Sequence, residues 1–251
     1  RAKKIEGNPA HPVSQGRLCV RGQAGLHTLY NPDRLTGPLL RAGEGKPGEL
    51  IPITWDEGIS QLAERLNVLR DDGQGNRICF LSKGVRGHLA ELFELFVDQL
   101  GSSRLLHYDF AHPQTLYAAI DRLFGETHLP YYVKNTRFLL SFGADYLGSW
   151  ISPVHHGLGF GHSRQGRDGI RGRFVQIEPR MSLSGAAADE WIAANPGTEG
   201  ILALGIGNYI VSQGGYQGSD REEWAASLAA YSVESVATQT GVPAATIARL
   251  A

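Results

Sequence analysis

The sequence predicts an α/β fold in which a mainly parallel sheet is covered by helices on both faces. Three observations predict it: short apolar runs without alternation, amphipathic segments between these runs, and Gly or polar residues directly after each run. Strands that are apolar on both faces are typical of buried parallel sheets. Because such sheets bind ligands beyond the carboxyl ends of their strands, the residues that follow each run are the first place to look for a site.

Composition limits the classes of function. The chain has 251 residues, of which 42% are hydrophobic and 20% charged, enough for one large domain or for one domain and part of another. Lys and Arg number 24 against 25 Asp and Glu, so the formal net charge of −1 creates no field that would attract nucleic acid or anionic lipid. No run approaches the ~20 apolar residues of a membrane span. We expect neither a nucleic-acid partner nor a direct membrane span.

The first fifty residues differ from the rest. Residues 1–50 are rich in Gly, Pro and Arg and show little periodicity, which predicts a small, irregular, β-rich segment that packs on something else. From Thr54 onward the pattern becomes regular, because Thr54 and Glu57 have the spacing of a capping box that begins a helix. We therefore expect a domain boundary near residue 50, with an α/β domain over residues 51–251.

The following elements alternate as an α/β fold requires. The helix after Thr54 has its apolar face at helical spacing, and it precedes a strand over residues 78–81. A second amphipathic helix covers residues 89–100, and a third covers residues 114–124. Strands at residues 138–142 and 174–177 follow, then a strong helix at about residues 200–212 and the start of another at residues 243–251.

Several conspicuous residues have no functional pattern around them. The glycines of residues 157–161 lack the preceding strand and following helix of a dinucleotide fingerprint, so we interpret them as a flexible loop. His155 and His156 have no metal-ligand spacing and are interpreted as surface or loop histidines. Cys79 lies in the apolar run of residues 78–81, which predicts a core thiol without function.

A family resemblance carries the analysis further. The run Gly16-Arg17-Leu18-Cys19-Val20-Arg21-Gly22-Gln23, preceded by residues 4–9 and 11–13, resembles the sequence around the fourth cluster cysteine in the dimethyl-sulfoxide-reductase family of molybdopterin oxidoreductases. Residues 29–35, 38–39 and 53–57 continue the similarity in the family's order and spacing. Residues 140–145, 175–180 and 196–199 are similar to the family's dinucleotide-contacting loops. Chance similarity is disfavoured because the matches cover most of the chain in one order.

The resemblance implies a Rossmann-like domain with a site for molybdopterin guanine dinucleotide. Gly143 would let backbone approach a pyrophosphate, and Glu178 and Glu199 would accept hydrogen bonds from guanine or ribose. Arg180 would clamp a phosphate or pair with Asp189. The alternative is that the acidic residues only cap helices and shape turns. The implied contacts with the dinucleotide are Gly143, Ala144, Asp145, Glu178, Pro179, Arg180, Gly197, Thr198 and Glu199.

The resemblance also implies a 4Fe-4S cluster. Cys19 matches the last of four cysteine ligands, and the other three would precede Arg1. Arg21 matches a cation that lies between cluster and pterin in the family, where a fixed charge would tune the reduction potential. The alternatives are a buried free thiol for Cys19 and a surface salt bridge for Arg21.

The sequence departs from the catalytic pattern of the family at the metal. The alignment places Ala111, His112 or Pro113 where a Ser, Cys or selenocysteine ligand is expected. The sequences of residues 141–150 and 178–186 most resemble the molybdopterin-like iron–sulfur subunit of alternative complex III, a quinol-oxidising respiratory assembly. Such subunits are understood to carry clusters without the pterin metal, so the dinucleotide itself is an open question.

Two functions are therefore compatible with the sequence. The first is a respiratory electron-transfer subunit that works with other domains of the same protein and with iron–sulfur, cytochrome or membrane quinol-oxidising subunits. The second is a catalytic bis-molybdopterin guanine dinucleotide reductase of sulfur compounds or oxyanions. The resemblance implies a location on the exported, periplasmic face of the bacterial inner membrane in either case. A plain nicotinamide dehydrogenase is disfavoured because no fingerprint has the required context.

Overall fold

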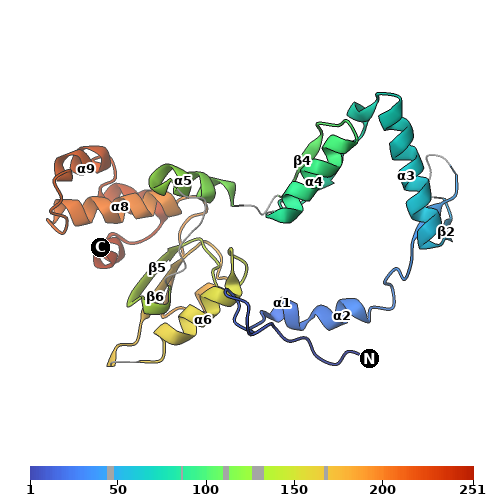
Figure 1. Ribbon diagram of the computed structural model, residues 1–251. Coiled ribbons are helices and arrows are strands. Elements are labelled where there is room, and N and C mark those ends of the chain that lie inside the picture. The colour runs from blue at the N-terminus through green and yellow to red at the C-terminus, as the bar shows by residue number, and fades with distance from the viewer. Residues whose placement is uncertain (44–47, 86, 110–112, 126–132, 167–168) are drawn as a thin grey trace. The chain divides into compact units, whose positions relative to one another are not determined.

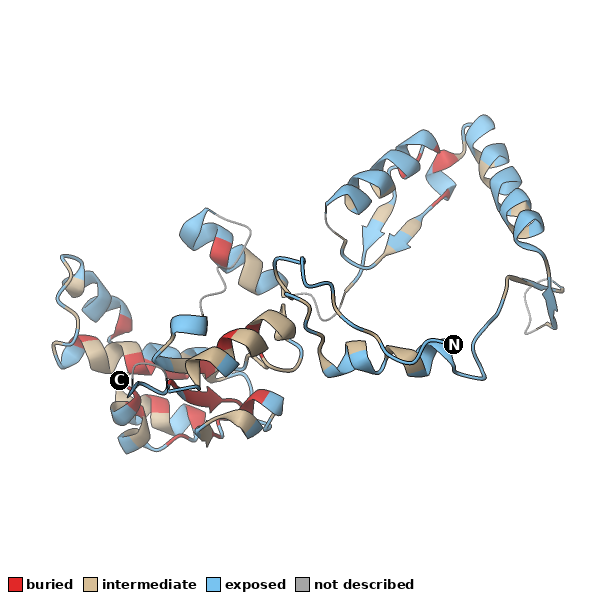
Figure 2. Ribbon diagram, turned by 60° about the horizontal axis from the view of Figure 1, so that its bottom comes forward, coloured by how far each residue is buried: buried red, intermediate tan, exposed pale blue. Residues whose placement is uncertain are grey.

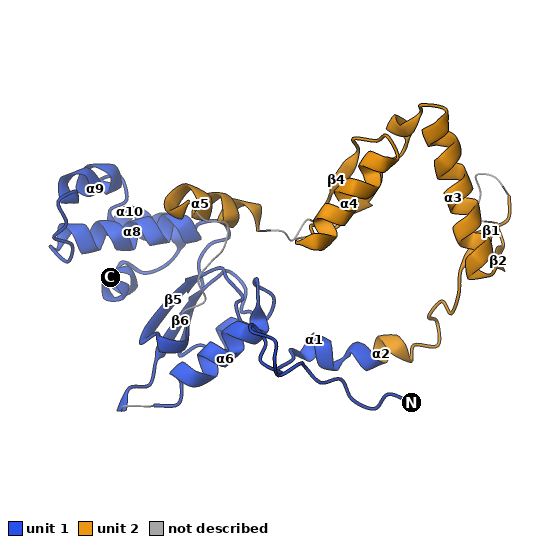
Figure 3. Ribbon diagram, viewed as in Figure 1, with its two compact units in different colours: residues 1–26, 130–251 blue, residues 27–129 orange. Residues whose placement is uncertain are grey.

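The computed structural model describes residues 1–43, 48–85, 87–109, 113–125, 133–166 and 169–251 (Figure 1). Backbone packing divides the chain into two compact units (Figure 3). Unit 1 combines residues 1–26 with residues 130–251, and unit 2 covers residues 27–129. These units do not coincide with the expected boundary at residue 50, which stays a prediction.

The sheet of unit 1 confirms the predicted parallel α/β architecture. It has the order β5-β6-β7, with β5 at Phe138–Phe142, β6 at Arg173–Ile177 and β7 at Glu190–Ile192. Both pairs of strands are parallel. β5 has the predicted bounds and β6 begins one residue earlier than predicted. β7 was not predicted, because its three residues include no apolar run.

Strand β6 is the centre of the core and is covered on both faces. Phe174 and Gln176 face one side and Val175 and Ile177 the other, and all four are at most 2% exposed (Figure 2). Val175 and Ile177 pack in the core with three helices, α8 (Glu199–Ser212), α10 (Val233–Thr240) and α11 (Ala244–Leu250). The ring of Phe174 packs instead on Phe160 of α6 (Pro153–Ser163).

Two glycines of α8 give a matched test of this packing. A Cβ atom on Gly205 would lie 2.8 Å from both Cγ atoms of the buried Val236, whereas one on Gly207 would make an ordinary 3.5 Å contact with Leu228. We expect Gly205→Ala to lower the free energy of unfolding by about 1–2 kcal/mol through overpacking. Gly207→Ala should raise it by about 0.5–1 kcal/mol, because alanine loses less backbone entropy in a helix. Urea unfolding of both variants measures the difference, and equal effects would contradict this packing.

The glycine-rich residues 157–161 form part of α6, so the prediction of a flexible loop was wrong. The reason for glycine at one position is close packing. A Cβ atom on Gly159 would lie 3.1 Å from both the backbone nitrogen of Lys134 and the Cβ of Val133, which belong to the 3₁₀ helix η2 (Val133–Asn135). The missing side chain lets η2 lie directly against α6, which periodicity alone does not reveal.

The N-terminal region combines short helices with a hairpin. Residues 1–19 form turns and extended chain, followed by α1 (Val20–Gln23) and α2 (Gly25–Leu29), which were not predicted. An antiparallel hairpin pairs β1 (Leu39–Arg41) with β2 (Leu50–Pro52). The hairpin agrees with the expected β-rich character of this region.

Unit 2 contains the predicted helices and a small parallel sheet of two strands. Helix α3 (Trp55–Asp71) begins with the predicted capping box, in which the Glu57 amide donates to Thr54 Oγ1 at 3.2 Å and the Thr54 amide donates to Glu57 Oε2 at 2.8 Å. The unit continues with the 3₁₀ helix η1 (Gly75–Arg77), β3 (Phe80–Ser82), α4 (His88–Gln99), β4 (Leu105–His107) and α5 (Gln114–Phe124). Strand β4 pairs in parallel with β3.

Burial in unit 2 differs from expectation in two ways. Cys79 is exposed and precedes β3, so the prediction of a core thiol was wrong; its neighbour Ile78 is the buried residue. On the predicted apolar face of α4, Val97 and Leu100 are buried, but Leu92 and Phe96 are 56% and 44% exposed. Ile59 and Leu62 of α3 are 61% and 60% exposed. The physical reason is that neither two-stranded sheet of this unit is large enough to cover the apolar face of an amphipathic helix.

Among the residues described, no helix combines the length and apolar character needed to cross a membrane.

Candidate functional site

The three predicted dinucleotide loops follow three adjacent parallel strands. Residues 143–145 follow β5, residues 178–180 follow β6, and residues 197–199 come after β7, where α8 begins. Because the strands are parallel, their carboxyl ends share one edge of the sheet. The Gly143 amide donates to the Ile177 carbonyl at 2.8 Å and the Glu178 amide to the Ile192 carbonyl at 3.2 Å, so the ladder continues into the first two loops.

Gly143 provides accessible backbone at this edge. Its φ of 66° lies in the left-handed region, and no atom lies within 4 Å of the position that a Cβ atom would take. A ligand phosphate can therefore approach the chain closely here. The next carbonyl, that of Ala144, accepts from Gln176 Nε2 at 3.3 Å.

The Glu178 side chain shapes the turn after β6. It is 4% exposed, its Oε1 accepts from the Ser182 amide at 2.6 Å, and its Oε2 accepts from Gln176 Nε2 at 3.1 Å. Both oxygens thus have partners within the chain, as the turn-forming alternative expects.

Asp145 has a similar structural role after β5. Its Oδ1 accepts from the amide and the hydroxyl of Ser184, at 3.1 and 2.8 Å. Burial raises the pKa of Asp145, but hydrogen bonds from Ser184, Ser182 and Ser149 together outweigh burial and hold the pKa below its ordinary value. Asp145 is therefore an ionised acceptor that joins the loop after β5 to α7 (Leu183–Ala187).

Arg180 does not pair with Asp189, so that interpretation was wrong. Asp189 instead accepts from Arg164, from Arg171 Nη1 at 3.0 Å and from the Phe174 amide at 2.8 Å. Pro179 and Arg180 are exposed at the sheet edge, and within the described ranges Arg180 makes no hydrogen bond or ion pair. Its guanidinium is available to an anion.

The third loop presents the start of a long helix. Gly197 has a φ of 78°, Thr198 is the N-cap residue of α8 and Glu199 occupies its first turn. Thr198 Oγ1 donates to the Asn195 carbonyl at 2.7 Å and does not cap the helix. The first amides of α8 and the positive end of its dipole therefore lie at the edge that carries Gly143 and Arg180.

The surroundings of Cys19 lower the pKa of its thiol. Cys19 is the N-cap residue of α1, and the nearby Gly22 amide is the largest effect that lowers the pKa of its thiol. The amide of Arg21 and its positive charge act in the same direction. A thiolate is the form of cysteine that binds metal, so this residue fits a cluster ligand. In the part of the chain that is described, no three His, Cys, Asp or Glu side chains form a metal site, so a cluster needs other ligands.

Cys19 and Arg21 line a cavity of about 370 Å³ that lies against the α/β part of unit 1. Arg17, Leu18 and Val20 complete the N-terminal side of the cavity. The opposite wall contains Leu147, Gly148, Pro153, Val154, Gly157, Leu158 and Leu183. His155 Nδ1 lies 3.1 Å from the Val13 carbonyl, which also connects α6 with the N-terminal segment.

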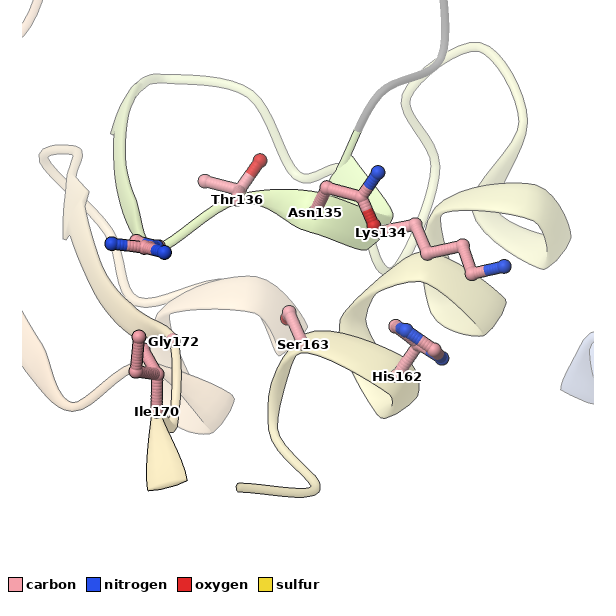
Figure 4. Close-up of a pocket in the computed structure, with 8 residues that line it drawn as sticks. Lys134, Asn135, Thr136, His162, Ser163, Ile170 and Gly172 are labelled. Carbon is pink, nitrogen blue, oxygen red and sulfur yellow. The ribbon is translucent and has the colours of Figure 1, made fainter. Parts of the chain in front are cut away.

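A second, polar cavity of about 220 Å³ lies at the other end of the sheet (Figure 4). Thr136 and Arg137 line it just before β5, Gly172 just before β6, and His162 and Ser163 at the end of α6. Because it lies at the amino ends of these strands, this cavity is separate from the predicted dinucleotide edge.

Sequence reasoning missed two buried groups beside the site. His156 is 3% exposed, and burial lowers its pKa to about 4, so its interpretation as a surface or loop histidine was wrong. Tyr146 is 3% exposed, and burial raises the pKa of its phenol. The two rings pack edge to face, with centroids 5.8 Å apart. The missed signal was the helical spacing of His156 and Phe160, which share one face of α6.

The metal-loop positions are only partly described. Ala111 and His112 lie outside the described residues, so nothing is said of their structure. Pro113 precedes α5 as its N-cap residue and has no side-chain atom that could bind a metal.

Comparison with known families and proteins gives a consistent set of similarities. Residues 1–31 match the model of the molybdopterin oxidoreductase Fe4S4 domain. The menaquinone reductase molybdopterin-binding-like subunit of Nitratidesulfovibrio vulgaris is 30% identical over 100% of this chain and 36% of its own length. The arsenate respiratory reductase molybdopterin-containing subunit of Shewanella sp. (strain ANA-3) is 30% identical over 85% of this chain and 25% of its own length. The thiosulfate reductase molybdopterin-containing subunit of Salmonella typhimurium is 27% identical over 98% of this chain and 32% of its own length.

A solved structure shows the same fold. Acetylene hydratase from Pelobacter acetylenicus superposes with a TM-score of 0.61 and 20% identity, over 96% of this chain and 33% of that one. The chain thus spans about a third or less of the length of the proteins that it resembles.

Proposed function

Because this chain belongs to the molybdopterin oxidoreductase family, we propose that it serves a respiratory protein that moves electrons through a 4Fe-4S cluster, with Cys19 as one ligand. The observation that carries the proposal is the environment of Cys19. It combines a thiol whose pKa is lowered by the Gly22 and Arg21 amides at the start of α1 with a match to the iron–sulfur domain over residues 1–31. Three further cysteines of the complete protein would complete the cluster.

Arg21 would act on the cluster through charge. It is exposed at the same cavity as Cys19 and contributes to the lowered pKa of that thiol. A fixed cation stabilises added electron density, so Arg21 would raise the reduction potential and promote acceptance of an electron.

The edge of the sheet in unit 1 would hold the pyrophosphate part of a molybdopterin guanine dinucleotide. Gly143 offers open backbone, Arg180 offers a guanidinium, and residues 197–199 offer the start of α8. Ala144, Asp145, Glu178 and Pro179 would shape the loops around them. The dinucleotide supplies pterin dithiolene chemistry when bound. The chain's own residues would orient it.

We favour a quinol-linked electron-transfer subunit without a metal ligand at the pterin. The similarity to a menaquinone reductase subunit supports this assignment, and so does Pro113, which is one of the three residues, with Ala111 and His112, that the sequence places where the family has its metal ligand. The resemblance to the alternative complex III subunit suggests the same role. The partners would be other domains of the same protein and iron–sulfur, cytochrome or membrane quinol-oxidising subunits. The location would be the periplasmic face of the inner membrane.

The second candidate is a catalytic reductase of sulfur compounds or oxyanions. The observation that favours it is similarity to an arsenate reductase and a thiosulfate reductase, together with an edge that leaves Gly143 and Arg180 open. In that case pterin dithiolenes and solvent would hold the metal.

Metal and pterin analysis of the complete protein tests these proposals. We expect about four iron atoms for each cluster, with molybdenum and tungsten far below one atom per protein. Elemental analysis gives the metals, and fluorescence of the released, oxidised pterin gives the dinucleotide. Stoichiometric molybdenum or tungsten with pterin would establish the second candidate, and absence of iron would refute both.

A further inference from the structure

The cavity at Cys19 has an apolar wall that comes from the α/β domain. Leu147 lies in the loop after β5, Val154 and Leu158 lie on α6, and Leu183 begins α7. On this side the cavity is lined otherwise by Gly148, Pro153 and Gly157, so among the residues described none that lines this wall is charged. The charges at the cavity, Arg17 and Arg21, belong to the N-terminal segment.

A hydrogen-bond network fixes this wall. Asp145 Oδ1 accepts from the amide and the hydroxyl of Ser184, and Ser184 Oγ accepts from the Leu147 amide at 2.9 Å. Ser184 is fully buried and follows Leu183 directly. The Asp145–Ser184 contact thus holds Leu147 and Leu183, two wall residues 36 positions apart in the sequence, in one arrangement.

The backbone of Asp145 fixes the loop as well. Its carbonyl accepts from the amides of Gly148, Ser149 and Trp150 at 3.1, 2.9 and 3.0 Å. A Cβ atom on Gly148 would lie 2.1 Å from Asp145 Oδ2, so only glycine fits beside this carboxylate. Ile151, which follows, has a φ of 50°, a conformation that is strained for a β-branched residue. The surrounding contacts determine the path of the loop so strongly that this strain is tolerated.

An apolar wall has a defined effect on a cluster bound at Cys19. A 4Fe-4S cluster held by thiolates is an anion in both oxidation states, and reduction adds one further negative charge. Exclusion of water and low local polarity disfavour the more highly charged state, so they lower the reduction potential. Arg21 on the other side of the cavity acts in the opposite direction.

We propose that Leu147, Leu158 and Leu183 form the apolar face of the iron–sulfur site and lower its reduction potential, and that Asp145 and Ser184 are positioning residues that hold this face. The proposal rests on the assignment of Cys19 as a cluster ligand. It gives Asp145 a role toward the cluster, in addition to its role at the dinucleotide edge. The α/β domain would then set the cluster potential together with the N-terminal segment.

The test is a redox titration of the complete protein, with dithionite as reductant, in which electron paramagnetic resonance measures the reduced cluster. Leu183→Asn introduces an amide beside the site at a side chain that is 58% exposed, so folding should not suffer. We expect its midpoint potential to move to more positive values than that of the wild type. Ser184→Ala removes the hydroxyl that accepts from the Leu147 amide and donates to Asp145, and it should move the midpoint potential in the same direction. Leu204→Asn on α8 is the matched control, because Leu204 lines a different cavity, and its midpoint should not move.

Two kinds of failure are distinguishable. A wild-type protein without any cluster signal would refute the proposed function and the assignment of Cys19. A cluster signal whose midpoint is the same in wild type and Leu183→Asn would overturn only the apolar-face proposal. An equal shift in Leu204→Asn would overturn it too, because the effect would then not depend on proximity to Cys19.

Discussion

A Cys19→Ser variant of the complete protein is expected to lose most of the iron of this cluster and its electron paramagnetic resonance signal. Serine lacks the thiol whose pKa the Gly22 and Arg21 amides lower in the wild type, and its hydroxyl is a much weaker ligand of iron. A cluster with one missing ligand is unstable or converts to a form with fewer iron atoms. Iron analysis together with the spectrum of the dithionite-reduced protein measures the effect.

Cys79→Ser is the matched control for this experiment. Cys79 is the other cysteine of the chain, and it is exposed beside β3 in unit 2. Its replacement should leave the iron content and the spectrum unchanged. If both variants kept their full iron content, Cys19 would not be a ligand, and the electron-transfer proposal would lose the observation that carries it.

Asp189→Asn is expected to lower the free energy of unfolding of unit 1 by about 2–3 kcal/mol near pH 7. Asp189 accepts from Arg164, Arg171 and the Phe174 amide, and its side chain is 25% exposed. Asparagine keeps the shape but removes the charge and one acceptor oxygen, so the guanidinium of Arg164, whose side chain is only 15% exposed, loses its anion. Urea unfolding followed by circular dichroism measures the loss.

The pH dependence separates Asp189 from His156. The hydrogen bond from Arg164 holds the pKa of Asp189 far below its ordinary value of about 3.9. Below pH 4 the unfolded state therefore binds more protons at Asp189, and stability falls as the pH falls. Burial lowers the pKa of His156 to about 4, so this residue makes stability fall between about pH 6.5 and 4.

The two windows give the prediction a built-in control. Below pH 4, the free energy of unfolding of Asp189→Asn should depend less on pH than that of the wild type. Between pH 6.5 and 4, the two proteins should show the same dependence on pH. His156→Gln should do the reverse. If Asp189→Asn were as stable as the wild type at pH 7, the contact between Asp189 and Arg164 would contribute no net stability to the fold.

The sequence by itself determined the fold class and the places where the site could lie. Apolar runs at residues 138–142 and 174–177 became β5 and β6, because short apolar runs without alternation favour the strands of a parallel sheet. The capping box at Thr54 began α3, since its two hydrogen bonds are local. The order of strands in a parallel sheet then placed Gly143 and Glu178 at one edge. The family pattern identified Cys19.

Only the tertiary structure decided which of these residues have partners within the chain and which face a ligand. Glu178 is surrounded by Ser182 and Gln176, whereas Arg180, two residues later, is open. Asp145 meets Ser184 across 39 residues, and Arg164 meets Asp189 across 25. Such contacts depend on how α6 and α7 pack against the sheet. Side chains distant in sequence become neighbours only through that packing, so no local pattern of residues could have specified them.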